Sequence, residues 1–182
     1  MMTKDVILDE TADYIQQSEK NLELALQIER ALPIVRKKLI VNVLDAIKKN
    51  FPQEVWSIED SQSNMMDRNA SLILKKRSKN EDQARIILGS DPAGWSRVWI
   101  GCDFGGESKY RDFKQDKVER LNNRGFKDRS PKIGFFKYYN DELKNWSEMS
   151  FLKIAMGDDD EVSKIASEIS DNLKDISKIV DD

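Results

Sequence analysis

Histidine is missing from this 182-residue chain, and cysteine occurs once, as Cys102. Without histidine, Ser-His-Asp and Cys-His catalysis are excluded, because both need an imidazole to carry a proton. The usual zinc sites are excluded as well, since they combine Cys and His ligands. A magnesium site made of carboxylates stays open, and so does binding without chemistry. No catalytic residue, metal ion or cofactor is assigned from the sequence, and we expect a protein that is not an enzyme.

A single cysteine cannot form an intramolecular disulfide, so nothing in the sequence suggests an oxidising compartment. Long apolar runs are also lacking, and the longest falls far short of a membrane span. The first residues lack the charged-then-apolar order of a signal peptide. These absences predict a cytoplasmic protein with no membrane partner.

The residues that are present suffice for one packed core. The hydrophobic fraction is 39%, and the chain contains 4 Trp, 7 Phe and 4 Tyr, which argues against global disorder. Charged residues make up 35%, but 30 basic and 33 acidic side chains leave a net charge of only −3. Net charge therefore identifies no partner.

Apolar residues recur at helical spacing over residues 5–50. We expect the first helix to end before Pro33, which would take the first position of a second helix. The second helix carries a wide apolar stripe from Ile34 to Ile47, which implies burial. Residues 1–32 are accordingly interpreted as a separable N-terminal helix, and residues 33–182 as a single α+β domain. Whether the first helix packs on that domain or projects from it stays open.

The middle of the chain, about residues 53–155, has the short apolar runs and turn signals of strands. The turn at residues 91–94 has Pro second and Gly fourth, so residues 84–104 are predicted to form a hairpin. Further strands are expected at 134–139 and 146–154. Residues 114–124 are predicted to form a short helix that stops at Gly125.

The C-terminal segment has the clearest pattern. Four consecutive acidic residues from Asp158 to Glu161 favour a helix start, and apolar residues then recur every three or four positions up to Val180. Together the patterns predict an α+β fold: an antiparallel sheet of about five strands packed against N- and C-terminal helices. The second and last long helices should cover one face of that sheet.

Several aromatic and glycine positions carry a family resemblance. They are Gly94-Trp95, Val98-Trp99-Ile100-Gly101, Gly134-Phe135-Phe136-Lys137-Tyr138-Tyr139, Trp146, Leu152-Lys153-Ile154 and Gly157, followed by the final helix. Residues 33–177 resemble the C-terminal accessory region of bacterial proteins with a PD-(D/E)XK (restriction-endonuclease-like) nuclease core. The resemblance implies a role linked to bacterial or phage DNA metabolism or defence.

The nuclease core itself is not matched. Its signature needs an acid-x-Lys triplet on a strand, where the acids hold magnesium and the lysine steadies developing charge. The nearest such triplets, at residues 107–109 and 112–114, follow a glycine-rich bend and lie on no apolar strand. The resemblance therefore implies the accessory region without its nuclease.

The strand after the predicted turn alternates between two kinds of side chain. Val98, Ile100, Cys102 and Phe104 should point toward the helices, and Trp95, Arg97 and Trp99 should point away from them. The second set has the composition of a stacking platform for bases or a partner side chain. Ordinary packing, with Arg97 covering an aromatic surface, is the interpretation that we favour.

Residues 109–137 form a basic stretch within this acidic protein. Ten basic and four acidic residues give the stretch a net charge of +6. The basic residues are Lys109, Arg111, Lys114, Lys117, Arg120, Arg124, Lys127, Arg129, Lys132 and Lys137. Such a stretch is suited to binding phosphates. The alternative is a solvated surface whose charge is neutralised by the acidic C-terminal helix.

Three functions are compatible with these observations. The leading one is a non-enzymatic protein-interaction or regulatory module, whose partner is an unknown protein or a second copy of the chain. The second is nucleic-acid binding through Trp95, Arg97 and Trp99 and the basic stretch. A metal-dependent nuclease is a distant third.

Overall fold

The computed structural model of the chain describes residues 4–62, 65–77, 84–91, 94–104, 115–130, 134–140 and 142–181. The chain divides into two compact units, unit 1 (Met1–Lys38) and unit 2 (Leu39–Asp182). The boundary predicted from the sequence, after residue 32, falls earlier in the same helix.

Unit 1 holds α1 (Lys4–Gln16) and the first part of α2 (Glu19–Lys49). The two helices separate at Ser18, whose Oγ accepts a 3.1 Å hydrogen bond from the backbone N–H of Asn21. A serine here caps the first turn of a helix, where backbone donors otherwise lack partners. The prediction that the second helix begins at Pro33 is wrong, since Pro33 lies inside α2. A proline removes one backbone hydrogen bond from a helix interior, so α2 continues past it at a local cost.

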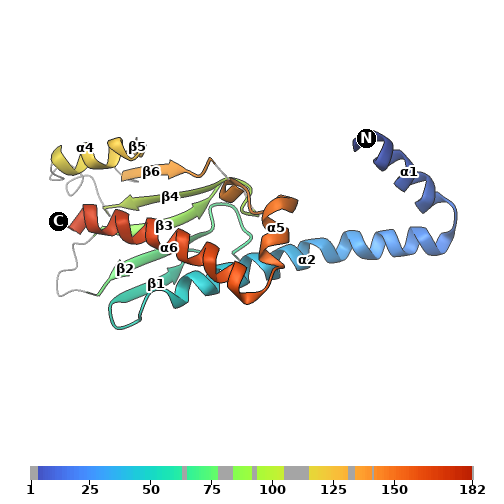
Figure 1. Ribbon diagram of the computed structural model, residues 1–182, viewed down its shortest axis with the longest axis horizontal. Helices are drawn as coiled ribbons and strands as arrows, with labels where there is room; N and C mark the ends of the chain where they lie inside the picture. The colour runs from blue at the N-terminus through green and yellow to red at the C-terminus, as the bar shows by residue number, and fades with distance from the viewer. Residues whose placement is uncertain are drawn as a thin grey trace. The chain divides into compact units, whose positions relative to one another are not determined.

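Unit 2 is built on an antiparallel sheet with the order β1-β2-β3-β4-β6-β5 (Figure 1). The described strands are β1 (Trp56–Asp60), β2 (Ser71–Lys76), β3 (Arg85–Ser90), β4 (Val98–Asp103), β5 (Lys127–Ser130) and β6 (Gly134–Tyr138). The predicted α+β class is confirmed, with six described strands where about five were expected. The additional strand is the short β5 at the sheet edge.

One face of the sheet is covered by helices. The helices after β4 are α4 (Gln115–Asn123), the 3₁₀ turn η1 (Glu142–Lys144), α5 (Met149–Ala155) and α6 (Asp159–Asp181). The long α6 crosses the strands in Figure 1, and its apolar stripe shares one core with side chains of β2, β3 and β4. The part of α2 that belongs to unit 2 joins this core through Ile40, Val43, Leu44 and Ile47, all of which are buried.

Local signals explain where two of these helices begin and end. At the start of α6, Asp158 Oδ1 accepts a 3.0 Å hydrogen bond from the backbone N–H of Glu161. The acidic run therefore caps the helix and complements its dipole, as the sequence predicts. The predicted short helix is α4, and Gly125 follows it at φ +81°, a conformation that suits glycine after a helix.

The strand predicted at residues 146–154 is wrong, because α5 occupies this stretch. Phe151, Leu152 and Ala155 are buried along one side of the helix, at helical spacing. The Phe151 ring stacks on Trp146 with a centroid distance of 4.8 Å and an interplanar angle of 3°. So short an apolar run does not distinguish a strand from a buried helix, and here tertiary packing decides.

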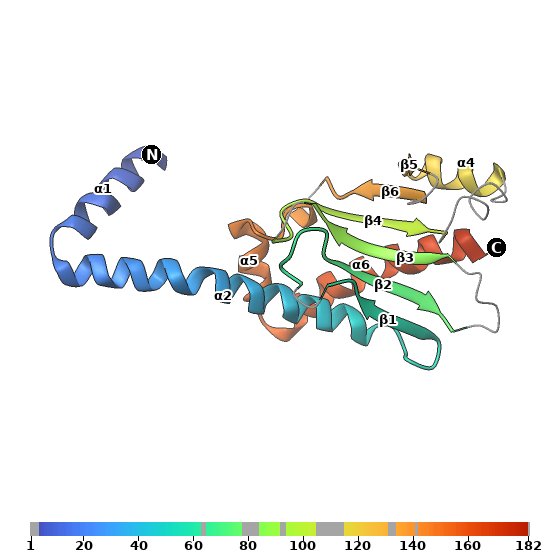
Figure 2. The same ribbon diagram turned by 180° about the vertical axis from the view of Figure 1, so that it is seen from behind.

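Figure 2 shows the sheet from the side opposite α6. The strand register places Ile73, Ile87 and Trp99 on this second face, since their neighbours along each strand point toward α6. Ile87 and Trp99 are each 8% exposed and lie outside the main core cluster. The centre of this second face is therefore apolar, and the Arg85–Asp103 ion pair lies on the same face at one end of the β3–β4 pairing.

Candidate functional site

Trp95 does not lie on the second face of the sheet, contrary to the sequence prediction. It precedes β4 in a turn, at φ +60°, so the alternation of the strand does not reach it. The side chain is fully buried, and its Nε1–H donates a 2.6 Å hydrogen bond to the carbonyl of Met65. Its ring stacks on Trp146 at a centroid distance of 4.8 Å. Trp95 is therefore a core residue with no ring face open to a ligand.

Trp99 and Arg97 do occupy the sheet region where the sequence places them, but Trp99 is buried, and the exposed Arg97 already contacts a ring of the protein itself. Trp99 is only 8% exposed, although period-two alternation puts it opposite the core residues Val98 and Ile100. The guanidinium carbon of Arg97 lies 3.9 Å from the centroid of the Tyr138 ring, in a cation–π contact. The pair thus fits the packing interpretation better than a platform for bases.

The basic stretch is only partly described, because Lys109, Arg111, Lys114 and Lys132 lie outside the described residues, as do the acid-x-Lys triplets at 107–109 and 112–114. Of the basic residues that are described, Arg120, Arg124, Lys127 and Lys137 are exposed. Lys117 instead donates a 2.8 Å hydrogen bond from Nζ to the carbonyl of Val180, near the end of α6. A cation at a helix C-terminus is stabilised by the helix dipole.

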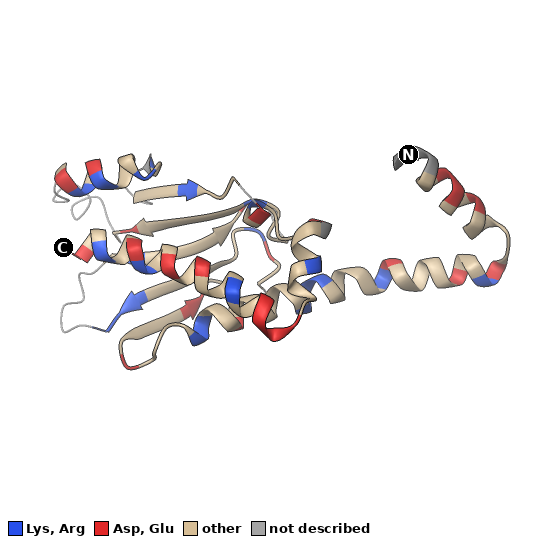
Figure 3. Cartoon of the chain, in the orientation of Figure 1, with Lys and Arg blue, Asp and Glu red and all other residues tan. Residues whose placement is uncertain are grey.

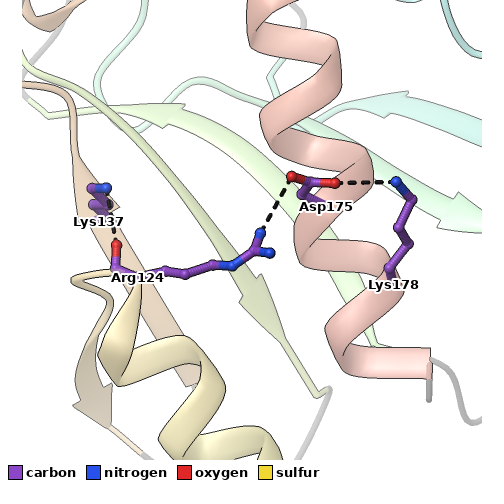
Figure 4. A network of polar contacts seen from close by, with 4 residues as sticks. All are labelled: Arg124, Lys137, Asp175 and Lys178. Carbon is purple, nitrogen blue, oxygen red and sulfur yellow. Dashed lines mark hydrogen bonds and ion pairs between the residues drawn. The ribbon is translucent and has the colours of Figure 1, made fainter.

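Arg124 and Lys137 belong to a polar network that joins the basic stretch to α6 (Figure 4). Arg124 Nη1 lies 3.3 Å from Asp175 Oδ2, and Lys178 Nζ lies 3.1 Å from Asp175 Oδ1. Lys137 Nζ donates a 2.9 Å hydrogen bond to the carbonyl of Arg124. The hydrogen bond from Lys178, with further help from Arg124, holds the pKa of Asp175 below its ordinary value. The acidic helix therefore balances part of the basic stretch.

A pocket of about 300 Å³ lies between the sheet and α6, and Lys137, Tyr139, Glu168 and Asn172 are among its lining residues. Asn172 Nδ2 donates a 3.5 Å hydrogen bond to the Tyr139 hydroxyl, and Lys137 is held by the carbonyl of Arg124. These hydrogen bonds occupy polar groups of Asn172, Tyr139 and Lys137. Among the described side chains that line the pocket, no nucleophile is paired with a base.

The described residues provide neither an activated thiol at Cys102 nor a cluster of acidic metal ligands. Burial raises the pKa of the Cys102 thiol to about 12, and Asp103 nearby adds to the rise, against a smaller opposing effect of a backbone hydrogen bond at Phe135. A thiol that stays protonated is a poor nucleophile and metal ligand. Within the described part of the chain, no three acidic or thiol side chains lie close enough together to hold a metal ion.

Most of the exposed large hydrophobic side chains of the described residues lie on unit 1. Twelve large hydrophobic side chains are exposed in the described residues, and ten of them belong to α1 and α2 between residues 7 and 35. They are Ile7, Leu8, Tyr14, Leu22, Leu24, Leu26, Ile28, Leu32, Ile34 and Val35. We call this set the unit 1 apolar surface. Scattered single apolar residues are normal on a protein surface, whereas a dense group of them is the pattern that interaction surfaces usually show.

These side chains point in several directions around α2. Leu22, Leu24 and Leu26 follow one another at two-residue steps, each of which turns about 200° around a helix. In unit 1 only Ile15, Asn21 and Ala25 are partly buried among the described side chains. A helix that is apolar on all sides normally lies in a core. The apolar spacing is visible in the sequence, but spacing alone does not show that these side chains stay exposed in the folded chain.

Charge is distributed unevenly along unit 1. Residues 4–29 contain seven acidic residues and two lysines, a net charge of −5. Residues 30–38 contain four basic residues, Arg30, Arg36, Lys37 and Lys38, and no acidic one. Figure 3 shows the acidic residues gathered along α1. Unit 1 is thus an apolar pair of helices with an acidic first part and a basic end.

No family model matches the chain, and no curated protein or solved structure matches it either. The resemblance to nuclease-associated accessory regions stays a prediction. No described helix combines the length and the apolar character needed to cross a membrane.

Proposed function

We propose that this chain is a non-enzymatic protein-interaction module, in which unit 2 is a folded scaffold and unit 1 is the docking element. The observation that carries the proposal is the unit 1 apolar surface, with ten of the twelve exposed large hydrophobic side chains of the described residues. At about 25 cal/mol per Å² of buried apolar area, covering such a surface supplies substantial binding energy.

Unit 2 supports this division of roles. Its helices and sheet share one core that includes Ile169, Leu173 and Phe151, each with no exposed surface. Only two of its described large hydrophobic residues, Val55 and Met156, are exposed. Unit 2 therefore satisfies its own apolar groups, whereas unit 1 leaves its apolar side chains in water.

Nucleic-acid binding is the weaker candidate. Its expected stacking residues, Trp95 and Trp99, are buried, and Arg124 is paired with Asp175. The exposed Arg120 and Lys127 favour it, since each phosphate contact adds to affinity. A role in bacterial or phage DNA metabolism or defence rests on the family resemblance alone. A nuclease or methylase gene beside the gene for this chain would support that role. We also propose that the protein is cytoplasmic.

The test compares two variants of the full chain. One replaces Leu24, Leu32 and Ile34 of unit 1 by Gln, and the matched control replaces Val55 and Met156 of unit 2 by Gln. All five side chains are exposed, so both variants should keep their fold. After chemical cross-linking in cells, the wild type and the control should give the same cross-linked species, and the unit 1 variant should lose them. Identical patterns for all three proteins would refute the proposed docking role.

A further inference from the structure

We propose that the partner of unit 1 is a second copy of this chain, and that two α2 helices pair in antiparallel orientation over residues 24–35. The inference rests on the proposed function and names its partner. Two kinds of observation carry it: the spacing of an exposed apolar stripe, and the distribution of charge along unit 1.

The stripe consists of Leu24, Ile28, Ala31 and Val35. Their spacing of four, three and four residues is that of the core positions of paired helices, so all four lie on one side of α2. Ala31 is exposed, and Leu24, Ile28 and Val35 are 54%, 52% and 44% exposed. The stripe is therefore well formed and uncovered in a single chain.

The spacing of this stripe reads the same in both directions. An antiparallel two-fold pair therefore brings the stripe onto itself, with Leu24 opposite Val35 of the second copy and Ile28 opposite Ala31. Large and small side chains then face each other at the centre, which suits close packing. The next positions of the same pattern are Asn21 and Lys38, so the seam ends in a polar residue on each side.

Charge selects the antiparallel orientation. The acidic part of unit 1, residues 4–29, has a net charge of −5, and residues 30–38 carry four basic residues. A parallel pair would place like charges side by side. In the register of the stripe, the antiparallel pair sets residues 30–38 of each copy, with their four basic residues, level with residues 21–29 of the other copy, which carry Glu23 and Glu29 and no basic residue. Complementary charges of this kind fix orientation and disfavour the alternative pairing.

Charge also argues against two other partners for the unit 1 apolar surface, nucleic acid and a membrane. Nucleic acid would meet the acidic excess of residues 4–29. A membrane surface attracts amphipathic helices whose polar face is rich in Lys and Arg, and α1 has four acidic residues and one lysine. A second copy offers both the apolar cover and the opposite charge.

The first experiment measures molar mass by sedimentation of the full chain over a range of concentrations. We expect a dimer for the wild type and a dissociation constant raised on the order of a hundredfold for Ile28→Lys, because each dimer would bury two charges in its seam. Leu26→Lys is the matched control. Leu26 is 43% exposed, close to the 52% of Ile28, but it lies two positions away on the other side of α2. Circular dichroism checks that all three proteins keep their helices.

The second experiment tests the register with single-cysteine substitutions. The native Cys102 is buried and does not interfere. A mixture of Leu24→Cys and Val35→Cys proteins should form a cross-linked heterodimer under oxidising conditions, and neither protein alone should cross-link efficiently. Efficient cross-linking of Leu24→Cys with itself indicates a parallel pair and overturns the proposal.

Charge reversal provides an independent check. Glu23→Lys and Arg36→Glu should each weaken the dimer, and added salt should weaken the wild-type dimer, because both lower the attraction between the acidic part of one copy and the basic end of the other. A wild-type chain that stays monomeric at high micromolar concentration overturns the self-pairing. If cross-linking in cells still captures another protein through unit 1, the docking function stands without it. If it captures none, both proposals fail.

Discussion

Trp99 and Gly89 are opposite each other in the register of β4 and β3, and the indole ring covers the place where a side chain at position 89 would stand. A Cβ atom added to Gly89 would lie 2.5 Å from Cζ2 of Trp99, closer than real Cβ contacts. The second face of the sheet therefore depends on this glycine for the position of its largest side chain.

We predict that Gly89→Ala destabilises unit 2 by about 1–3 kcal/mol, because the added methyl group displaces the Trp99 ring. Urea unfolding followed by circular dichroism measures the loss. Trp99→Leu alone should also destabilise the protein, but Gly89→Ala should cost much less when Trp99 is already Leu. Equal costs of Gly89→Ala in both backgrounds would show that the two residues are not coupled.

The core beneath α6 gives a second prediction. Ile169 and Leu173 have no exposed surface, and Ile169→Asp or Leu173→Asp should unfold unit 2, since an unpaired charge buried there costs several kcal/mol, comparable to total stability. Lys164→Asp, at an exposed position of the same helix, is the control and should change stability little. A thermal melt of Leu173→Asp that matches the wild type would mean that α6 is not packed on the sheet.

Much of this fold could be predicted from the sequence, because long periodic elements follow from local residue patterns. The α6 stripe and its Asp158 cap lie where expected, and so does the hairpin of β3 and β4. Prediction failed where a single local feature competes with another. Ser18, and not Pro33, separates the first two helices. The Ser18 side chain accepts a hydrogen bond from a backbone N–H at the start of α2 and so stabilises a new helix there, whereas Pro33 only removes one backbone hydrogen bond within a helix that continues.

The candidate sites were harder to predict than the fold, for two physical reasons. Strand alternation predicted that Trp95 and Trp99 share a face, but Trp95 adopts a positive φ before the strand begins, and its indole enters the core. For Leu24 and Ile28, the apolar spacing of the helix is the same whether the residues that pack on it belong to the same chain or to another. Only the exposure of these side chains in the folded chain shows whether the apolar side of the helix is buried within the same chain, and sequence periodicity does not.

The ion pair between Arg124 and Asp175 leads to a prediction about nucleic acid. We expect only weak binding of DNA or RNA at about 150 mM salt, because the acidic helix shields the basic stretch. Replacing Arg120, Arg124 and Lys127 together by Ala should then change the affinity for DNA or RNA little. Fluorescence anisotropy with labelled duplexes at several salt concentrations measures this. Micromolar binding whose salt slope falls by about two to three units in the triple variant would establish the nucleic-acid function instead.

Asp175→Asn tests the shielding directly. It removes the carboxylate that pairs with Arg124 and Lys178, so any residual affinity for nucleic acid should rise. Asp171→Asn is the matched control, since Asp171 lies on the same helix and pairs only with Lys174, at 4.0 Å, among the described ion pairs. Stability should change little in both variants, because exposed ion pairs contribute about 1 kcal/mol or less. Equal affinities for the two variants would mean that Asp175 shields nothing.

Cys102 gives a prediction on pH dependence. Burial raises its pKa from 9.0 to about 12, so between these values the unfolded chain loses a proton that the folded chain keeps. The folded state then binds more protons than the unfolded state, and stability must fall as the pH rises through this range. The steepest loss is about 1.4 kcal/mol per pH unit, and the pH dependence contributed by this group disappears only at pH values well below 9.

Lysine and tyrosine side chains also titrate in this range, so the test compares the wild type with Cys102→Ser. Serine has a similar size and does not ionise, and every other titration is common to both proteins. The free energy of unfolding from urea titrations should therefore fall faster with pH for the wild type, and the gap between the two proteins should narrow by about 2–3 kcal/mol from pH 9 to 11. A constant gap would show that Cys102 ionises as readily in the folded protein as in the unfolded chain, and hence that the face of β4 toward α6 is open to water.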